Sequence, residues 1–139
     1  MIYLSYTSPK SSKVIPKHKK NTVYLGQQGE DFAINYLEER KYTILERNWK
    51  YFKYEIDVIA QKHNEICFIE VKVRAINAPI KANKALSFNQ EKRIITAANH
   101  YLQKFEIDLS PRFDLIAITR QGNNLTLEHM KNTFFPTLD

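Results

Sequence analysis

The residues best suited to chemistry are three carboxylates and a lysine in the first half of the chain: Glu30, Asp57, Glu70 and Lys72. Asp57 lies in the β-branched run 55–61, and Glu70 and Lys72 lie in a second such run, 66–74. Side chains alternate along a strand, so Glu70 and Lys72 are expected on one face. Carboxylate oxygens suit Mg²⁺ or Mn²⁺, and a lysine stabilises charge on an attacked phosphodiester. The pattern predicts metal-assisted phosphodiester hydrolysis.

These two apolar runs flank a short polar segment, which is typical of a β-hairpin. With the turn centred between His63 and Asn64, Asp57 lies opposite Glu70 on the neighbouring strand. Cβ atoms of opposed residues are about 4.5–5.5 Å apart, and like charges placed there destabilise the sheet unless something compensates them. A divalent cation held by Asp57, Glu70 and Glu30 is the compensation that we predict.

The other face of this hairpin is apolar, with side chains at Cys67, Ile69, Val71 and Val73. We therefore expect one face of the hairpin to be core and the other to carry the site. Cys67 is the one cysteine of the chain, and no Cys or His lies near it at zinc-site spacing. It is expected to be a core residue.

The element expected before the hairpin is a helix over 26–41, followed by a strand over 42–49. Ala33, Ile34 and Leu37 form the helix's apolar stripe, and Glu30 lies at the N-terminal end of that stripe. Two interpretations of Glu30 stay open. It either interacts with the positive end of the helix dipole, worth about 0.3–1 kcal/mol, or reaches into a site shared with the hairpin.

The second half of the chain opens with Ser87 and Gln90 at capping-box spacing, which predicts a second helix. Its expected buried stripe is Ile94, Ala98, Tyr101, Leu102 and Phe105. Strands are expected over 112–119 and 125–129. The order is helix, three strands, helix, two strands, with the first three strands forming an antiparallel meander. This predicts an α/β fold in which helices flank a mixed sheet of about five strands.

At 139 residues, with 43% hydrophobic residues, the chain fits one domain, expected over 22–139. No apolar run approaches the roughly 18–20 residues of a membrane span, and no signal-peptide core is present, so we expect a cytoplasmic protein. Segment 1–21 is expected to be a flexible basic arm. Its charged residues are all lysines, Lys10, Lys13, Lys17, Lys19 and Lys20. The arm either contacts phosphates or acts as a solubilising tail.

Positive charge also gathers after the hairpin, where six basic residues between 72 and 93 face a single acidic residue, Glu91. A basic surface beside an acidic cluster suits a polyanion held over a cation. The alternative is a solvated surface with no partner. The candidate nucleic-acid contacts are Arg74, Lys81, Lys84, Gln90, Lys92 and Arg93.

An alternative also exists for the carboxylates, each of which could simply pair with a nearby lysine or arginine. For Asp57 alone this pairing is the better interpretation, since Asp is depleted in strands without being rare. For the whole set, in which an Asp precedes Glu-x-Lys on a paired strand, the metal site is the better interpretation.

Three motifs carry a resemblance to a known family: Gly26-Gln-Gln-Gly-Glu30, Glu55-Ile-Asp57-Val-Ile-Ala, and Phe68-Ile-Glu70-Val-Lys72-Val-Arg74. They resemble the bacterial YraN-like proteins of the UPF0102 family over about residues 26–119. That family is similar to the archaeal Holliday-junction resolvases and to the PD-(D/E)xK nucleases. Tyr54 stands where the family usually has glycine, and Gln90 where it more often has lysine.

The resemblance implies a restriction-endonuclease-like core and a Mg²⁺-dependent endonuclease. Asp57, Glu70 and Lys72 match the D…ExK residues, and Glu30 matches the helical glutamate of the resolvase-like branch. The implied substrate is DNA, branched or structured DNA included. Resolving a four-way junction needs two active sites, which makes a homodimer the implied assembly.

Two other function classes stay open. One is a non-catalytic nucleic-acid-binding module with the same fold, and the other is an adaptor whose basic arm binds an acidic protein. Metal dependence separates the nuclease from the binding module. Salt dependence separates both from the adaptor, because counterion release makes DNA binding weaken steeply with salt.

Overall fold

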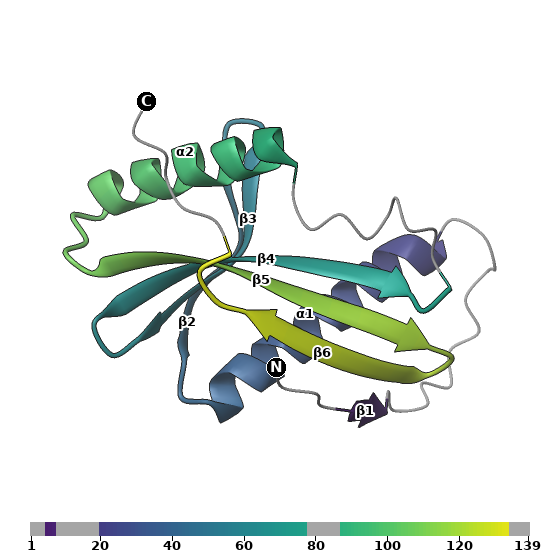
Figure 1. Cartoon of the computed structure of the whole chain (residues 1–139). Coiled ribbons are helices and arrows are strands. Elements are labelled where there is room, and N and C mark those ends of the chain that lie inside the picture. The colour runs from purple at the N-terminus through teal and green to yellow at the C-terminus, as the bar shows by residue number, and fades with distance from the viewer. Residues whose placement is uncertain (1–4, 8–19, 78–86, 134–139) are drawn as a thin grey trace.

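The computed structural model describes residues 5–7, 20–77 and 87–133 (Figure 1). The elements in order are β1 (Ser5–Thr7), α1 (Lys20–Glu39), β2 (Thr43–Tyr51), β3 (Tyr54–Lys62), β4 (Glu65–Ala75), α2 (Phe88–Lys104), β5 (Ser110–Gln121) and β6 (Asn124–Met130). From α1 onward this is the predicted order. The predicted α/β class is therefore confirmed.

The strands form one sheet in the order β1-β6-β5-β4-β3-β2. The neighbours β2, β3 and β4 pair antiparallel, which confirms the predicted meander, whereas β4 and β5 pair parallel. A parallel pair needs a long crossover connection, and α2 lies in that connection. The sheet is therefore mixed, as predicted.

The N-terminal segment differs from the prediction at its described residues. Ser5–Thr7 pairs with β6 as the sixth, edge strand of the sheet, and Lys20 and Asn21 already belong to α1. The rest of the predicted arm lies outside the described residues. The helix start at Gly26 was predicted too late, because a glycine costs a helix only about 1 kcal/mol and does not by itself end one.

The two helices cover opposite faces of the sheet (Figure 1). Cys67 and Ile69 are buried on the α1 face, and burial raises the pKa of the Cys67 thiol to about 12. Ile66 and Phe68 are fully buried on the α2 face. The expectation that one hairpin face would be core and the other site was therefore wrong for the first half of β4. Glu70 is the first residue of β4 at which the α2 face carries a charged side chain.

The predicted capping box of α2 is confirmed. Ser87 Oγ accepts a hydrogen bond from the Gln90 N–H, and Gln90 Oε1 accepts one from the Ser87 N–H, each at 3.2 Å. Ile94, Ala98 and Tyr101 are buried as expected, whereas Leu102 is only partly buried. Phe105 is 48% exposed, which contradicts its predicted burial, because the helix ends at Lys104.

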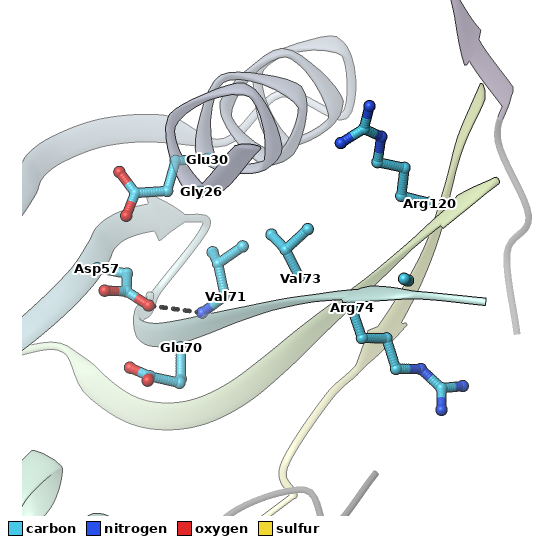
Figure 2. A pocket seen from close by; sticks show the side chains of 9 residues that line it. Gly26, Glu30, Asp57, Glu70, Val71, Val73, Arg74 and Arg120 are labelled. Carbon is cyan, nitrogen blue, oxygen red and sulfur yellow. Dashed lines mark hydrogen bonds between the residues drawn. The ribbon is translucent and has the colours of Figure 1, made fainter. Parts of the chain in front are cut away.

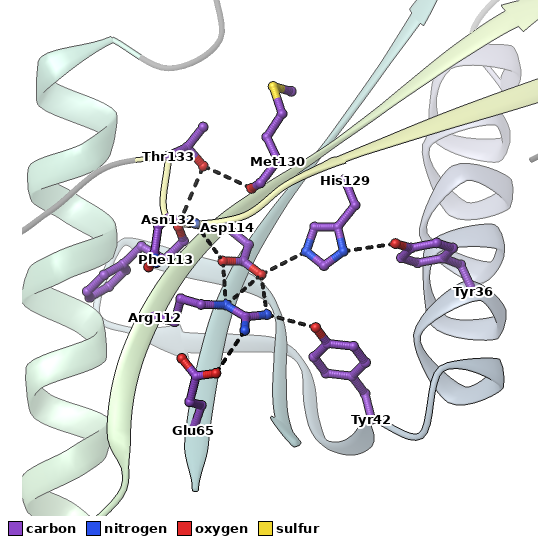
Figure 3. A network of polar contacts seen from close by, with 10 residues as sticks. All are labelled: Tyr36, Tyr42, Glu65, Arg112, Phe113, Asp114, His129, Met130, Asn132 and Thr133. Atoms are coloured by element: carbon purple, nitrogen blue, oxygen red, sulfur yellow. Dashed lines mark hydrogen bonds and ion pairs between the residues drawn. The ribbon is translucent and has the colours of Figure 1, made fainter. Parts of the chain in front are cut away.

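A buried polar network occupies the amino-terminal end of β5 (Figure 3). Arg112 donates to Asp114 through Nη2 at 2.8 Å and to the Tyr42 hydroxyl at 2.8 Å. His129 Nε2 lies 2.7 Å from Asp114 Oδ2, and its Nδ1 lies 3.0 Å from the hydroxyl of Tyr36. These contacts tie α1, β5 and β6 together through groups that water does not reach.

Neither helix in the described part of the chain is long and apolar enough to span a membrane.

Candidate active site

The predicted register of the hairpin is confirmed, and it ends where the candidate residues begin. Strands β3 and β4 pair from Lys62↔Glu65 to Val58↔Ile69, and the next pair in that register is Asp57 with Glu70. Beyond Val58, β3 stays paired with β2, whereas β4 stays paired with β5 as far as Ala75. The sheet therefore divides between two adjacent carboxylates.

This division leaves a backbone donor of β4 without a strand partner. Asp57 supplies the acceptor, since its Oδ2 receives the Val71 N–H at 2.8 Å (Figure 2). A buried N–H with no acceptor would cost about 1–3 kcal/mol. The hydrogen bond therefore satisfies the backbone and fixes the Asp57 side chain beside Glu70.

The surroundings of Asp57 and Glu70 disfavour the charged form of both carboxyl groups. Burial and then the charge of Glu70 raise the pKa of Asp57 to about 8, against the opposing hydrogen bond from Val71. Burial also raises the pKa of Glu70, although the charge of Lys72 opposes the shift. Lys72 Nζ lies 3.6 Å from Glu70 Oε1. Glu70 thus has one lysine beside it, and the neighbouring Asp57 raises the local negative charge, which favours either a bound proton or a second cation.

Glu30 approaches the pair from α1. Its charge raises the pKa of Asp57 further, and Figure 2 shows the Asp57 carboxylate between those of Glu30 and Glu70. Because α1 begins at Lys20, Glu30 lies in the middle of the helix, beyond the first turn in which the helix dipole acts. The dipole interpretation of Glu30 was therefore wrong. Glu30 lines the same cavity as Asp57 and Glu70, and its role in a shared site stays a prediction.

Asn48 is a further site residue that the sequence analysis did not find. Its Nδ2 donates to Glu30 Oε2 at 3.1 Å, and its φ of 50° places it in the left-handed region that Asn tolerates best after glycine. Asn is depleted in strands, so its presence between Arg47 and Trp49 in β2 was the available signal. This contact orients the Glu30 side chain from β2, next to the place where β3 and β4 separate.

The three carboxylates line one cavity of about 380 Å³ (Figure 2). Val71 and Val73 form its floor, and Arg74 and Arg120 contribute basic side chains to its wall. Arg120 Nε donates to the Gly122 carbonyl at 2.7 Å, which holds that side chain in place. An acidic wall beside basic side chains suits a phosphate group bridged to a cation.

The approach of α1 to β4 depends on a glycine. A Cβ placed on Gly29 would lie 2.2 Å from Val73 Cγ2, well inside van der Waals contact. Only a residue with no side chain allows α1 to pack this closely on β4. Gly29 therefore sets the position of its neighbour Glu30 at the place where β3 and β4 separate.

The structure assigns different surroundings to the other predicted contacts. Arg74 is exposed at the cavity. Gln90 caps α2 and, with Arg93 and Glu70, lines a second cavity of about 150 Å³. Lys92 Nζ lies 4.5 Å from the centre of the Phe88 ring. The two remaining candidates, Lys81 and Lys84, lie outside the described residues. Tyr54 and Gln90, the two positions at which this chain departs from the family motifs, both line this second cavity.

The carboxylates of this cavity fit a hard cation that is bound by few protein ligands and keeps several waters. Within the described ranges, no three His, Cys, Asp or Glu side chains converge closely enough to enclose an ion. Mg²⁺ usually takes one or two carboxylates and keeps several waters. Asp57 and Glu70 supply such a pair, and Glu30 stands across the cavity from them, where it can accept from a water.

Comparison with known proteins agrees with the motifs around this site. The model of the family described as "Uncharacterised protein family UPF0102" matches residues 29–118. A UPF0102 protein of Bacteroides thetaiotaomicron is 38% identical over 114 residues, covering 82% of this chain and 94% of that protein. A UPF0102 protein of Flavobacterium johnsoniae is 38% identical over 118 residues, covering 80% and 94%. The chain that carries Glu30, Asp57 and Glu70 in one cavity belongs to the UPF0102 family.

Proposed function

We propose that this protein is a divalent-metal-dependent nuclease that hydrolyses phosphodiester bonds in DNA, branched DNA included. The observation that carries the proposal is the partly buried pair Asp57 and Glu70, held side by side where the sheet divides. Two adjacent acids that are largely shielded from water are costly unless a cation joins them. A protein that needed only stability would gain from an apolar pair at these positions.

Asp57 and Glu70 would hold Mg²⁺ or Mn²⁺, which supplies charge opposite a phosphoryl oxygen and lowers the pKa of an attacking water. Glu30, held by Asn48, would accept a hydrogen bond from water on the α1 side of the cavity. Arg74 and Arg120 would hold the phosphate that enters. Each side chain thus has a role that its place in the cavity permits.

Lys72 is the residue proposed to act on the reacting groups directly. Its side chain is 40% exposed, and Nζ is close to Glu70. An ammonium group there stabilises the negative charge that grows on the phosphate and can orient the attacking water. The lysine cannot be replaced by a neutral side chain of similar length without loss of that charge.

The test is cleavage of labelled four-way junction, flap and linear DNA with Mg²⁺, Mn²⁺ or EDTA. Lys72→Met should cut at least about 100-fold more slowly than the wild type, the usual loss for one transition-state donor. Lys62→Met is the matched control, because Lys62 lies at the turn end of the same hairpin, over the Tyr42 ring. It should cleave at the wild-type rate. Metal-independent cleavage, or equal loss in both variants, would contradict the proposal.

A second candidate function is a nucleic-acid-binding module without catalysis. One observation favours it: no enclosed three-ligand group exists among the described residues. Binding that is the same in EDTA and Mn²⁺, with no cleavage of any of the three substrates, would support this module over the nuclease. The same preparations would be examined by sedimentation, since cutting two strands of a junction calls for a homodimer.

A further inference from the structure

The tip of the β2–β3 hairpin carries an unusual residue. Tyr51 and Tyr54 are the last pair of the ladder, so Phe52 and Lys53 form the two-residue turn. Such turns favour Asn, Asp or Gly, because their backbone requires positive φ. Phe52 has a φ of 53° and is 86% exposed. A bulky residue here costs both backbone strain and apolar exposure, which points to a use outside the fold.

Phe52 packs edge-on against a row of stacked rings. Its ring lies 4.7 Å from that of Tyr51, which itself stacks on His100 of α2 at 3.9 Å and 19°. Trp49 is nearly parallel to Tyr51 at 6.5 Å and 8°, and it also stacks on His100 at 6.1 Å and 27°. This row ties the hairpin tip to α2, so Phe52 is presented from a packed base.

The same tip is joined to the candidate active site. Lys53 and Tyr54 line the cavity of about 150 Å³ that Glu70 and Arg93 also line. Lys53 in the turn and Lys50, one pair further along the ladder, are both exposed. Figure 1 shows the turn between β2 and β3 reaching up behind α2. An aromatic tip, flanking cations and a path to Glu70 therefore lie along one surface.

We propose that Phe52 stacks on an unpaired nucleobase of DNA whose phosphates lie along Lys53 and Arg93 towards Glu70. This rests on the proposed nuclease function and specifies its substrate as DNA with an unpaired or splayed base. Every base has an apolar π-face, so an exposed ring backed by a row of rings binds one without reading sequence. In continuous duplex the bases stay stacked on one another and offer no face to Phe52.

Chain length limits where such a base can be. Phe52 and Asp57 are five positions apart in the sequence, so their Cα atoms lie at most about 17 Å apart at the rise of a strand. One strand of B-form duplex advances about 3.4 Å per phosphate. The cut should therefore fall within about five nucleotides of the unpaired base.

The test is DNA binding in EDTA, where no cleavage occurs, at one fixed salt concentration. Flap DNA with a single unpaired base at the branch is compared with linear duplex of equal length. Phe52→Ala should weaken flap binding by about 5- to 150-fold, the range for one base–aromatic stack, and leave duplex binding unchanged. Phe52→Tyr keeps the ring and should restore flap binding. Phe105→Ala, which removes another exposed phenyl ring at the far end of α2, is the matched control and should change neither.

A second readout uses the single tryptophan of the chain. Flap DNA should change the fluorescence of Trp49 in the wild type and not in Phe52→Ala, because the base joins the row that contains Trp49. Equal flap binding by wild type and Phe52→Ala would overturn this inference and leave the nuclease standing. A wild type that binds neither DNA would overturn both. A Phe52→Ala that turns a dimer into a monomer, with flap binding unchanged, would instead assign Phe52 to a contact between two copies.

Discussion

The Asp57 carboxylate accepts the Val71 N–H at 2.8 Å, so one candidate metal ligand is bound to the backbone beside the other. Val71 directly follows Glu70, and β3 and β4 separate at this place. The spacing of Asp57 and Glu70 is thus fixed by a main-chain hydrogen bond as well as by side-chain packing. A metal-free protein keeps the two acids together at an energetic cost.

Replacing Asp57 by Asn should stabilise the metal-free protein at alkaline pH. Since the folded-state pKa of Asp57 is raised to about 8, the folded protein binds more protons than the unfolded chain between about pH 4 and 8. Wild-type stability therefore falls as pH rises through that window. The Asn variant still accepts from Val71 and escapes this fall. Urea unfolding in EDTA should show equal stabilities near pH 5 and an advantage of about 1 kcal/mol for the variant near pH 8. A less stable variant at both pH values would mean that Asp57 pairs with a cationic side chain.

Divalent metal should raise the melting temperature of the wild type. A ligand that binds only the folded state stabilises it by about 2.7 kcal/mol at one hundred times its Kd. Mn²⁺ titrated in thermal melts should give this rise in the wild type and much less of it in Asp57→Asn. Asp108→Asn, an exposed change in the loop before β5, is the control and should respond like the wild type. Identical Mn²⁺ responses in all three proteins would place the metal elsewhere.

Arg112→Met should destabilise the fold by about 3–5 kcal/mol, because it leaves the Asp114 carboxylate, 0% exposed, without its arginine. Burial alone would raise the pKa of Asp114, but hydrogen bonds from His129 and Arg112 outweigh burial and lower it. This contribution to stability is therefore complete above about pH 4 and is lost as pH falls below that value. Glu65→Gln removes a contact of the same arginine from a side chain that is 45% exposed. Chemical denaturation should show a loss under about 1 kcal/mol for that control.

Neutralising the N-terminal lysines should flatten the salt dependence of DNA binding. Each phosphate contact that is lost lowers the slope of log K against log salt by about 0.9 for duplex DNA. Glutamine at Lys10, Lys13, Lys17 and Lys19 is a cleaner change than deletion of 1–21, since deletion would also remove β1 and the first residues of α1. Melting curves should be unaltered. An unchanged slope would assign these lysines to solubility.

What the sequence could predict here was whatever depends on local periodicity. Alternation and a turn centred between His63 and Asn64 were enough for the β3–β4 register, and Ser87 with Gln90 was enough for the start of α2. The edge strand Ser5–Thr7 is too short to show a period, and it exists through its pairing with β6. Asn48, similarly, meets Glu30 only after β2 folds beneath α1. Contacts between segments that are distant in the sequence cannot be predicted from the local spacing of residue types.

The division of the sheet was beyond prediction for the same reason. The register placed Asp57 opposite Glu70, but nothing local shows that the ladder stops at Val58, because β2 and β5 each hold one of the separating strands. The exposed Phe52 was also missed. Residues 50–54 were expected to connect two strands, but Tyr51, Phe52 and Tyr54 are all aromatic, and nothing local shows which ring the turn leaves exposed.

The width of the candidate active-site cavity depends on the absence of a side chain at Gly29. Since α1 rests on Val73 at that point, any side chain at position 29 acts as a spacer between the helix and β4. Alanine there would move the Glu30 wall outward while the Asp57–Val71 bond kept the opposite wall in place. Substitutions of increasing size at position 29 should therefore widen the cavity in steps and change the space left for a cation and a phosphate.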